Sequence, residues 1–146
     1  MKGNIYFDIN HILVLKHPSI RQNLLKDSLF ATRNSNGLHE RIICIHIRVT
    51  QQSRNITASL YGELDHHAAA WAKDELDRLI WRYREADLIL DLKNLSFMDS
   101  SGLGVILGRY KALKAAGRSM YVKNPNRQIE KVFNVSGIYK IIKKLK

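Results

Sequence analysis

A short apolar run near the middle of the chain constrains the fold most. Residues 87–92 carry four apolar side chains and only two aspartates, Asp87 and Asp91. A short, nearly continuous apolar run of this kind is typical of a central β-strand that is covered on both faces. We therefore expect residues 87–92 to form a strand inside a sheet, with helices packed against it.

The segments on both sides of this run follow alternating strand and helix patterns. Stretches rich in β-branched and aromatic residues predict strands, and apolar residues at helical spacing predict helices. The first expected elements are strands at residues 41–49 and 55–61, the latter ended by Gly62, followed by a helix that Asp65 caps. After the strand at residues 87–92 we expect a helix from Leu103 to Gly117 and a strand at residues 119–122. A third helix begins at Asn124 and Pro125 and ends at Gly137, and residues 138–145 form a strand or the start of a helix. The order β-β-α-β-α-β-α predicts an α/β sandwich of helices against a mixed sheet.

The net charge of +11 comes from 24 Lys and Arg against 13 Asp and Glu. Such a balance is typical of proteins that bind nucleic acid or anionic membranes. The charge is local, however, because residues 102–146 hold eleven Lys and Arg and a single acid, Glu130, whereas residues 1–101 are nearly neutral. This distribution is explained either by a solvated basic face or by electrostatic steering toward an acidic protein partner.

Cysteine usage and hydropathy predict a cytoplasmic protein without a membrane anchor. Cys44 is the single cysteine, so no intrachain disulfide forms, and its apolar neighbours predict a small buried core thiol. No stretch reaches the roughly 18 apolar residues that a membrane-spanning helix needs.

Two serines, Ser100 and Ser101, lie between the expected buried strand and the start of a helix. A hydroxyl at this place lies beside free N–H groups and the positive end of the helix dipole. The sequence lacks the Gly-x-Ser-x-Gly elbow of a nucleophilic serine and the Gly-Lys-Ser/Thr of a phosphate loop. The alternatives are a helix-capping serine, a phosphorylated serine that controls a binding surface and, less favoured because these motifs are absent, a catalytic serine.

A second polar loop, residues 62–67, ends in the adjacent His66 and His67. Histidines beside acids are candidates for a metal site or a general base. Adjacent residues at a helix start point about 100° apart, however, so the two imidazoles do not easily ligate one ion. We expect helix capping and surface contacts here, and no metal.

The two loops together resemble the anti-sigma factor antagonists of endospore-forming bacteria, in particular those of the sigma F type, which are single STAS domains. The resemblance is carried by residues 62–67, by the long motif at residues 95–111 and by residues 133–142, and it covers about residues 42–142. It implies a STAS-type sandwich, in which a mixed sheet has helices packed mainly on one side.

The resemblance also implies a partner switch that regulates transcription in sporulation. The unphosphorylated domain would bind an anti-sigma factor that is also a serine kinase, so that the sigma factor is released. Phosphorylation of Ser100 would end this binding, and a PP2C-like phosphatase would restore it. The implied partner-binding residues are Asp65, His66, Asp99, Ser101, Gly102, Leu103 and Gly104. The resemblance implies no catalytic residue, no metal and no cofactor, so the domain would be a ligand and a substrate but not an enzyme.

The chain departs from the family pattern at both ends. Residues 1–40 have no counterpart, and we expect either a poorly ordered extension or an upstream segment added by a misplaced start. Residues 41–146 would form the STAS domain, but the family's last helix does not follow residues 141–146. We expect its absence to uncover apolar surface near the third helix, which would lower stability or promote association.

Two other functions remain open at the level of sequence. The first is a STAS module that binds a nucleotide or another small molecule, although the chain lacks a phosphate loop. The second is a basic nucleic-acid-binding protein, although no known motif and no interleaved surface aromatics support it.

Overall fold

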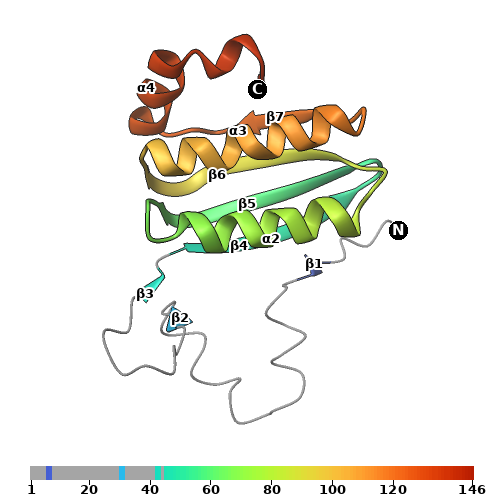
Figure 1. Cartoon of the computed structure of the whole chain (residues 1–146), viewed down its shortest axis with the longest axis horizontal. Coiled ribbons are helices and arrows are strands. Elements are labelled where there is room, and N and C mark those ends of the chain that lie inside the picture. The colour runs from blue at the N-terminus through green and yellow to red at the C-terminus, as the bar shows by residue number, and fades with distance from the viewer. Residues whose placement is uncertain (1–5, 8–29, 32–41, 44) are drawn as a thin grey trace.

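The computed structural model describes residues 6–7, 30–31, 42–43 and 45–146 of the chain (Figure 1). In this part, six strands form one sheet in the order β1-β4-β5-β6-β7-β8, and β2 pairs separately with β3. The elements are β1 (Tyr6–Phe7), β2 (Phe30–Ala31), β3 (Ile42–Ile43), β4 (Ile45–Gln52), β5 (Asn55–Leu64), α2 (Ala69–Arg82), β6 (Asp87–Met98), α3 (Ser100–Ala115), β7 (Met120–Lys123), α4 (Arg127–Ser136), the 3-10 helix η2 (Ile138–Lys140) and β8 (Lys143–Leu145).

The sheet is mixed, as the order of the sequence patterns predicts. β4 and β5 form an antiparallel hairpin, whereas β5, β6, β7 and β8 run parallel to one another. From β4 onward the order is the expected β-β-α-β-α-β-α, and β8 adds a last strand at the edge beside β7. The predicted α/β sandwich is therefore confirmed, and residues 138–145 contain a short 3-10 helix followed by a strand.

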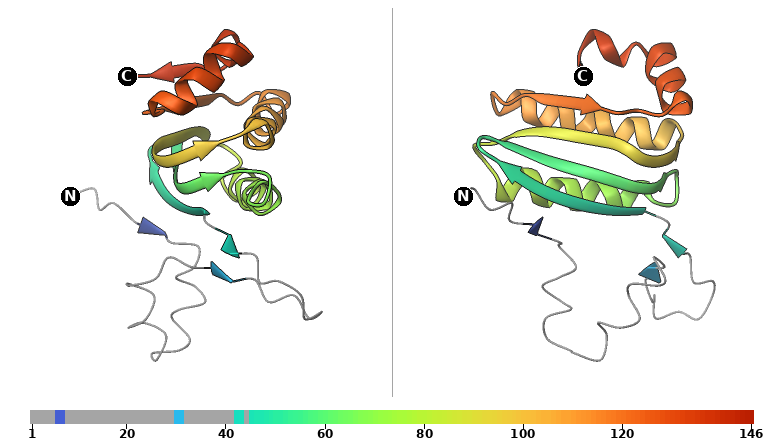
Figure 2. Two further views of the ribbon diagram at one scale, coloured as in Figure 1. Left: turned by 90° about the vertical axis from the view of Figure 1, so that its left-hand side faces the viewer. Right: turned by 180° about the vertical axis from the view of Figure 1, so that it is seen from behind.

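Helices α2 and α3 lie side by side on one face of the sheet, and no described helix covers the other face (Figure 2). In the described part of the chain, helices therefore cover residues 87–92 on one face only. Leu88, Leu90 and Leu92 are fully buried against the helices, whereas Ile89 and Asp91 point to the opposite face and are half-buried. A strand with helices on one side only buries every second residue, because successive side chains alternate between the faces.

Two expected boundaries differ from those in the structure, one at the end of β5 and one at the start of α2. Gly62 does not end β5, which continues to Leu64 through an irregular register beside β6. Gly62 has a φ of 98°, a left-handed conformation that glycine adopts without strain. The first helix begins at Ala69 rather than at Asp65, since a turn separates the two. Asp65 nevertheless caps this turn.

The third helix begins later than Asn124 and Pro125. Asn124 has a φ of 54°, which is incompatible with a right-handed helix start, and Asn126 is the cap of α4. The Asn126 side chain accepts a hydrogen bond from the N–H of Ile129 at 2.9 Å. The expected end at Gly137 is confirmed, with a φ of 70°.

Cys44 lies outside the described residues, as do residues 8–29 and 32–41. The expectations of a buried thiol and of an N-terminal extension at residues 1–40 therefore stay predictions. At the other end of the chain, two exposed apolar side chains lie in and after α4: Val135, which is 91% exposed, and Ile141, which is 46% exposed.

Candidate functional site

Asp99 is the cap of α3. Its backbone is extended, and its carboxylate oxygen Oδ1 accepts hydrogen bonds from the N–H groups of Ser101 at 2.8 Å and Gly102 at 3.2 Å. A cap of this kind satisfies N–H groups that have no partner inside the helix. The capping residue is therefore an aspartate, and neither serine is needed for this role.

The same carboxylate joins the two loops that the sequence singled out. Oδ2 of Asp99 accepts a hydrogen bond from the N–H of His66 at 3.1 Å. Asp65 in turn holds the second loop in shape, because its Oδ1 accepts from the N–H groups of His67 and Ala68, each at 2.9 Å. Residues 65–68 and the start of α3 thus form one continuous surface, although 33 residues separate His66 from Asp99.

Ser100 is exposed at the first residue of α3. Its hydroxyl has no hydrogen-bond partner among the residues that the structure describes. Ser101 and Leu103 are half-buried, and Gly104 is exposed one turn further along the helix. A modifying enzyme would therefore reach the hydroxyl of Ser100 without a change in the fold.

At Gly102, α3 packs tightly against the ends of β5 and β6. A Cβ atom at this position would lie 2.4 Å from the carbonyl oxygen of Leu64 and 2.6 Å from Cγ of Met98. Glycine is therefore required here by packing. A Cβ atom at Gly104, by contrast, would meet nothing within 4 Å.

Two residues of α4 brace the strand end that precedes Asp99. Gln128 donates to the carbonyl of Met98 at 3.0 Å and accepts from its N–H at 3.3 Å. Asn126 donates to the carbonyl groups of Leu95 and Ser96 at 2.7 and 3.1 Å. Neither role follows from a helix that starts at Asn124, and the sequence signals only the Asn126 cap, because asparagine is a favoured capping residue.

Phe97 is an exposed aromatic residue near the end of β6, two positions before Asp99. Its side chain is 40% exposed, just before Asp99, while the neighbouring Ser96 donates from its hydroxyl to the carbonyl of Gly62 at 2.9 Å. An exposed aromatic ring beside a capped helix start is the kind of anchor that protein partners bury. Nothing in the sequence around Phe97 distinguishes it from an ordinary core residue.

The two histidines lie next to each other at the turn before α2. Their rings lie edge to face, 5.5 Å apart. In the described part of the chain, no group of three or more His, Cys, Asp or Glu side chains is arranged to hold a metal ion. Within the same residues, no helix combines the length and the apolar character that crossing a membrane requires.

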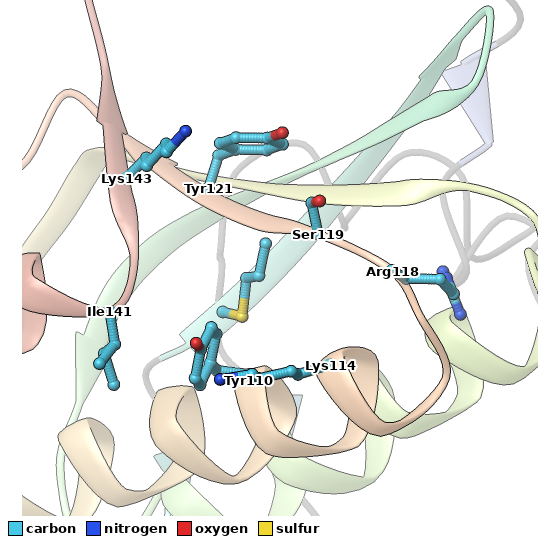
Figure 3. A pocket seen from close by; sticks show the side chains of 8 residues that line it. Tyr110, Lys114, Arg118, Ser119, Tyr121, Ile141 and Lys143 are labelled. Carbon is cyan, nitrogen blue, oxygen red and sulfur yellow. The ribbon is translucent and has the colours of Figure 1, made fainter.

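A pocket of about 220 Å³ lies near the opposite end of α3, between this helix and β7 (Figure 3). Tyr110, Met120 and Ile141 line it. Arg118 also borders it, but its guanidinium points toward α2 and donates to the carbonyl groups of Ala86, Ile80 and Tyr83 at 2.6, 2.9 and 2.8 Å. Burial lowers the pKa of Arg118, an effect that Asp87 and Glu85 oppose. This arginine therefore closes the end of α2 and does not serve the pocket.

Comparison with known proteins relates the chain to one family. The model of the STAS domain matches residues 46–146. An anti-sigma F factor antagonist of Paenibacillus polymyxa is 46% identical over 83 residues, which are 57% of this chain and 71% of that protein. The structure of the anti-sigma factor antagonist SpoIIAA in its unphosphorylated form superposes with a TM-score of 0.59 at 32% identity and covers 68% of this chain and 88% of that chain. SpoIIAA in its phosphorylated form, described as a Bacillus cell fate determinant, superposes with a TM-score of 0.55 at 31% identity. This match covers 68% of this chain and 91% of that chain.

Proposed function

Because this chain belongs to the STAS domain family, we propose that it is an anti-sigma factor antagonist that phosphorylation of Ser100 switches off. Relatives that are named anti-sigma F factor antagonists support the first part of this proposal. The solved structures of SpoIIAA, in an unphosphorylated and a phosphorylated form, support the second part. The protein is a ligand and a substrate in this scheme, and it needs no cofactor.

The partner-binding surface consists of Asp65, His66, Asp99, Ser100, Ser101, Gly102, Leu103 and Gly104, and we call it the Ser100 surface. The observation that carries the proposal is the carboxylate of Asp99, which accepts hydrogen bonds from the start of α3 and from the loop at His66 and so holds the two side by side. An exposed serine at the centre of a preformed surface is well placed to control docking. Gly104 leaves the exposed first turns of α3 without a side chain at this position, and packing inside the domain does not require a glycine there.

A phosphate on Ser100 would change binding more than folding. It adds about −1.5 to −2 charges at neutral pH. The start of α3 tolerates this charge, because the helix dipole is positive there. A partner that packs over the surface would have to desolvate the phosphate, beside the existing charges of Asp65 and Asp99. We therefore expect the domain to stay folded while the complex is lost.

The proposed partners are an anti-sigma factor with serine kinase activity and a PP2C-like phosphatase. In the kinase step, the Ser100 hydroxyl gives its proton to a base of the kinase and receives the γ-phosphoryl group of ATP, and ADP leaves. In the phosphatase step, water hydrolyses the phosphate ester and returns serine and inorganic phosphate. Unphosphorylated antagonist then binds the anti-sigma factor, and the released sigma factor joins RNA polymerase. The antagonist itself makes no contact with nucleic acid in this scheme.

The test is to incubate the full chain with its cognate anti-sigma kinase and ATP and to locate the phosphate by mass spectrometry. We expect one phosphate on Ser100, none on a Ser100→Ala variant, and normal labelling of Ser101→Ala as the matched control. Label on Ser101, or no label with an active kinase, would contradict the assignment. A titration of the same kinase with unmodified chain should displace the sigma factor, which tests the antagonist function separately.

A further inference from the structure

A second pocket lies at the end of the molecule opposite the Ser100 surface. It has a volume of about 280 Å³ and opens between the β4–β5 hairpin and the segment that follows α2. β6 starts at this end and reaches the Ser100 surface after 12 residues, which places the two sites roughly 36 Å apart at the usual rise per strand residue. In Figure 1 the hairpin and the end of α2 lie together on the right-hand side.

Arginines dominate the lining of this pocket. Arg54 comes from the hairpin, and Arg82 and Arg84 come from the end of α2 and the segment after it. Glu85 is the one acid among the lining residues, so the guanidinium groups outnumber it. An arginine presents a planar fork of donors that fits a carboxylate through two parallel hydrogen bonds.

Arg84 is held in place by an exposed tryptophan. Its guanidinium carbon lies 3.8 Å from the centre of the Trp81 ring, which is the geometry of a stacked cation–π pair. Trp81 is 71% exposed, although a ring of this size is usually covered. Arg84 lines the pocket, and its stacking places the exposed Trp81 ring next to that lining.

We propose that this pocket, which we call the arginine pocket, binds an acidic segment of a partner protein. Carboxylates of the segment pair with Arg54 and Arg84, and an apolar side chain packs on Trp81. Tryptophan and arginine together are the residues that dominate the energetics of protein interfaces. A second copy of this chain fits poorly, because it would bring the same guanidinium groups against each other. A membrane surface fits less well than a peptide, since the arginines line a hollow.

The experiment uses the full chain and a short labelled peptide of glutamates with one central leucine. We expect binding by fluorescence anisotropy that weakens as salt rises, with NMR shift changes at Arg54, Trp81 and Arg84. The variant Arg54→Glu with Arg84→Glu should lose about tenfold or more in affinity. The matched control, Lys93→Glu with Lys131→Glu, makes the same charge change at exposed positions elsewhere. It should lose much less.

Further variants keep the proposal open to refutation. Arg84→Lys keeps the charge and is expected to fold, but it removes the planar donor fork of the guanidinium and its stacking on Trp81. The affinity for the peptide should therefore fall several-fold. Equal losses in the control and in the pocket variant would show attraction by net charge only and overturn the proposal. Binding to anionic vesicles without binding to the peptide, or shift changes confined to other residues, would overturn it as well. Ser100→Asp should leave the peptide affinity unchanged, so this result is independent of the proposed switch.

Discussion

Asp99 and His66 are joined by a hydrogen bond of 3.1 Å from the backbone N–H of His66 to the carboxylate of Asp99. One side chain therefore serves two purposes, since its other oxygen caps α3. This carboxylate therefore contacts both parts of the Ser100 surface. Changes at Asp99 should consequently affect stability and partner binding together.

Replacement of Asp99 by alanine should lower the free energy of unfolding by about 1–2 kcal/mol, because the cap of α3 is lost. Urea denaturation measures this loss. Asp99→Asn keeps an oxygen that can cap the helix, but its amide group donates where the second carboxylate oxygen accepts. It should therefore be more stable than Asp99→Ala and still bind the anti-sigma factor less tightly. Equal stability of Asp99→Ala and the unmodified chain would contradict the role of the cap.

Gly102→Ala and Gly104→Ala form a matched pair with opposite expected effects on stability. The new methyl group at residue 102 would overlap the carbonyl of Leu64, which should cost about 1–3 kcal/mol. At residue 104 it meets open space, and alanine should stabilise α3 by up to about 1 kcal/mol. Thermal unfolding of the two variants measures both effects. If the Ser100 surface binds the anti-sigma factor, Gly104→Ala should nevertheless bind it less tightly, and unchanged affinity would remove Gly104 from that surface.

Ser100→Asp should separate binding from folding. We expect affinity for the anti-sigma factor to fall at least about tenfold, because a charge must be desolvated in the complex. The melting temperature should stay the same or rise slightly, since a carboxylate near a helix start contributes about 0.3–1 kcal/mol. Calorimetric titration and a thermal melt give the two values. Ser100→Ala is the control and should bind normally, and wild-type affinity of Ser100→Asp would refute the proposed mechanism.

Arg118→Ala should destabilise the domain by about 2 kcal/mol, because three carbonyl groups at the end of α2 lose a charged donor. Arg118→Lys should recover only part of this loss, since an ammonium group cannot reach all three carbonyls in one plane. Denaturation in urea distinguishes the variants. Full recovery by lysine would mean that charge alone matters at this position.

The pH dependence of stability at alkaline pH should report on Tyr139. Its hydroxyl donates to Glu130 at 2.8 Å, and burial together with this carboxylate raises the pKa of Tyr139 well above its ordinary value near 10. The folded chain therefore holds the phenolic proton more tightly than the unfolded chain. This contribution to stability is complete below about pH 10 and declines as the pH rises further. Stability measured between about pH 9 and pH 11 should fall more steeply for the unmodified chain than for Tyr139→Phe.

The sequence was sufficient to predict those features that depend on local patterns. The order of elements, the helix end at Gly137 and the position of the serine loop all follow from periodicity and from residues with special backbone preferences. The pairing of the His66 loop with Asp99 is a contact between distant segments, and only the family resemblance linked them.

The boundaries and contacts that the sequence patterns did not predict have equally specific causes. Glycine often ends a strand, but Gly62 lies in an irregular register that only the neighbouring β6 makes visible. Asn124 and Pro125 have the composition of a helix start, yet the backbone of Asn124 turns left-handed and moves the start to Arg127. A glutamine is common at polar positions of helices, and nothing around Gln128 in the sequence points to Met98. Its hydrogen bonds to Met98 could therefore not be inferred from the sequence.

The pair of hydrogen bonds between Gln128 and Met98 bears on how small a working fragment of this protein can be. A fragment that ended with β7 would keep Ser100, the Asp99 cap and helices α2 and α3. It would lack Gln128, which among the described side chains is the only one that hydrogen-bonds both the N–H and the carbonyl of Met98, the residue before that cap. The minimal unit for a switch of this design therefore includes α4, and fragments used to map its partners should be cut after residue 137.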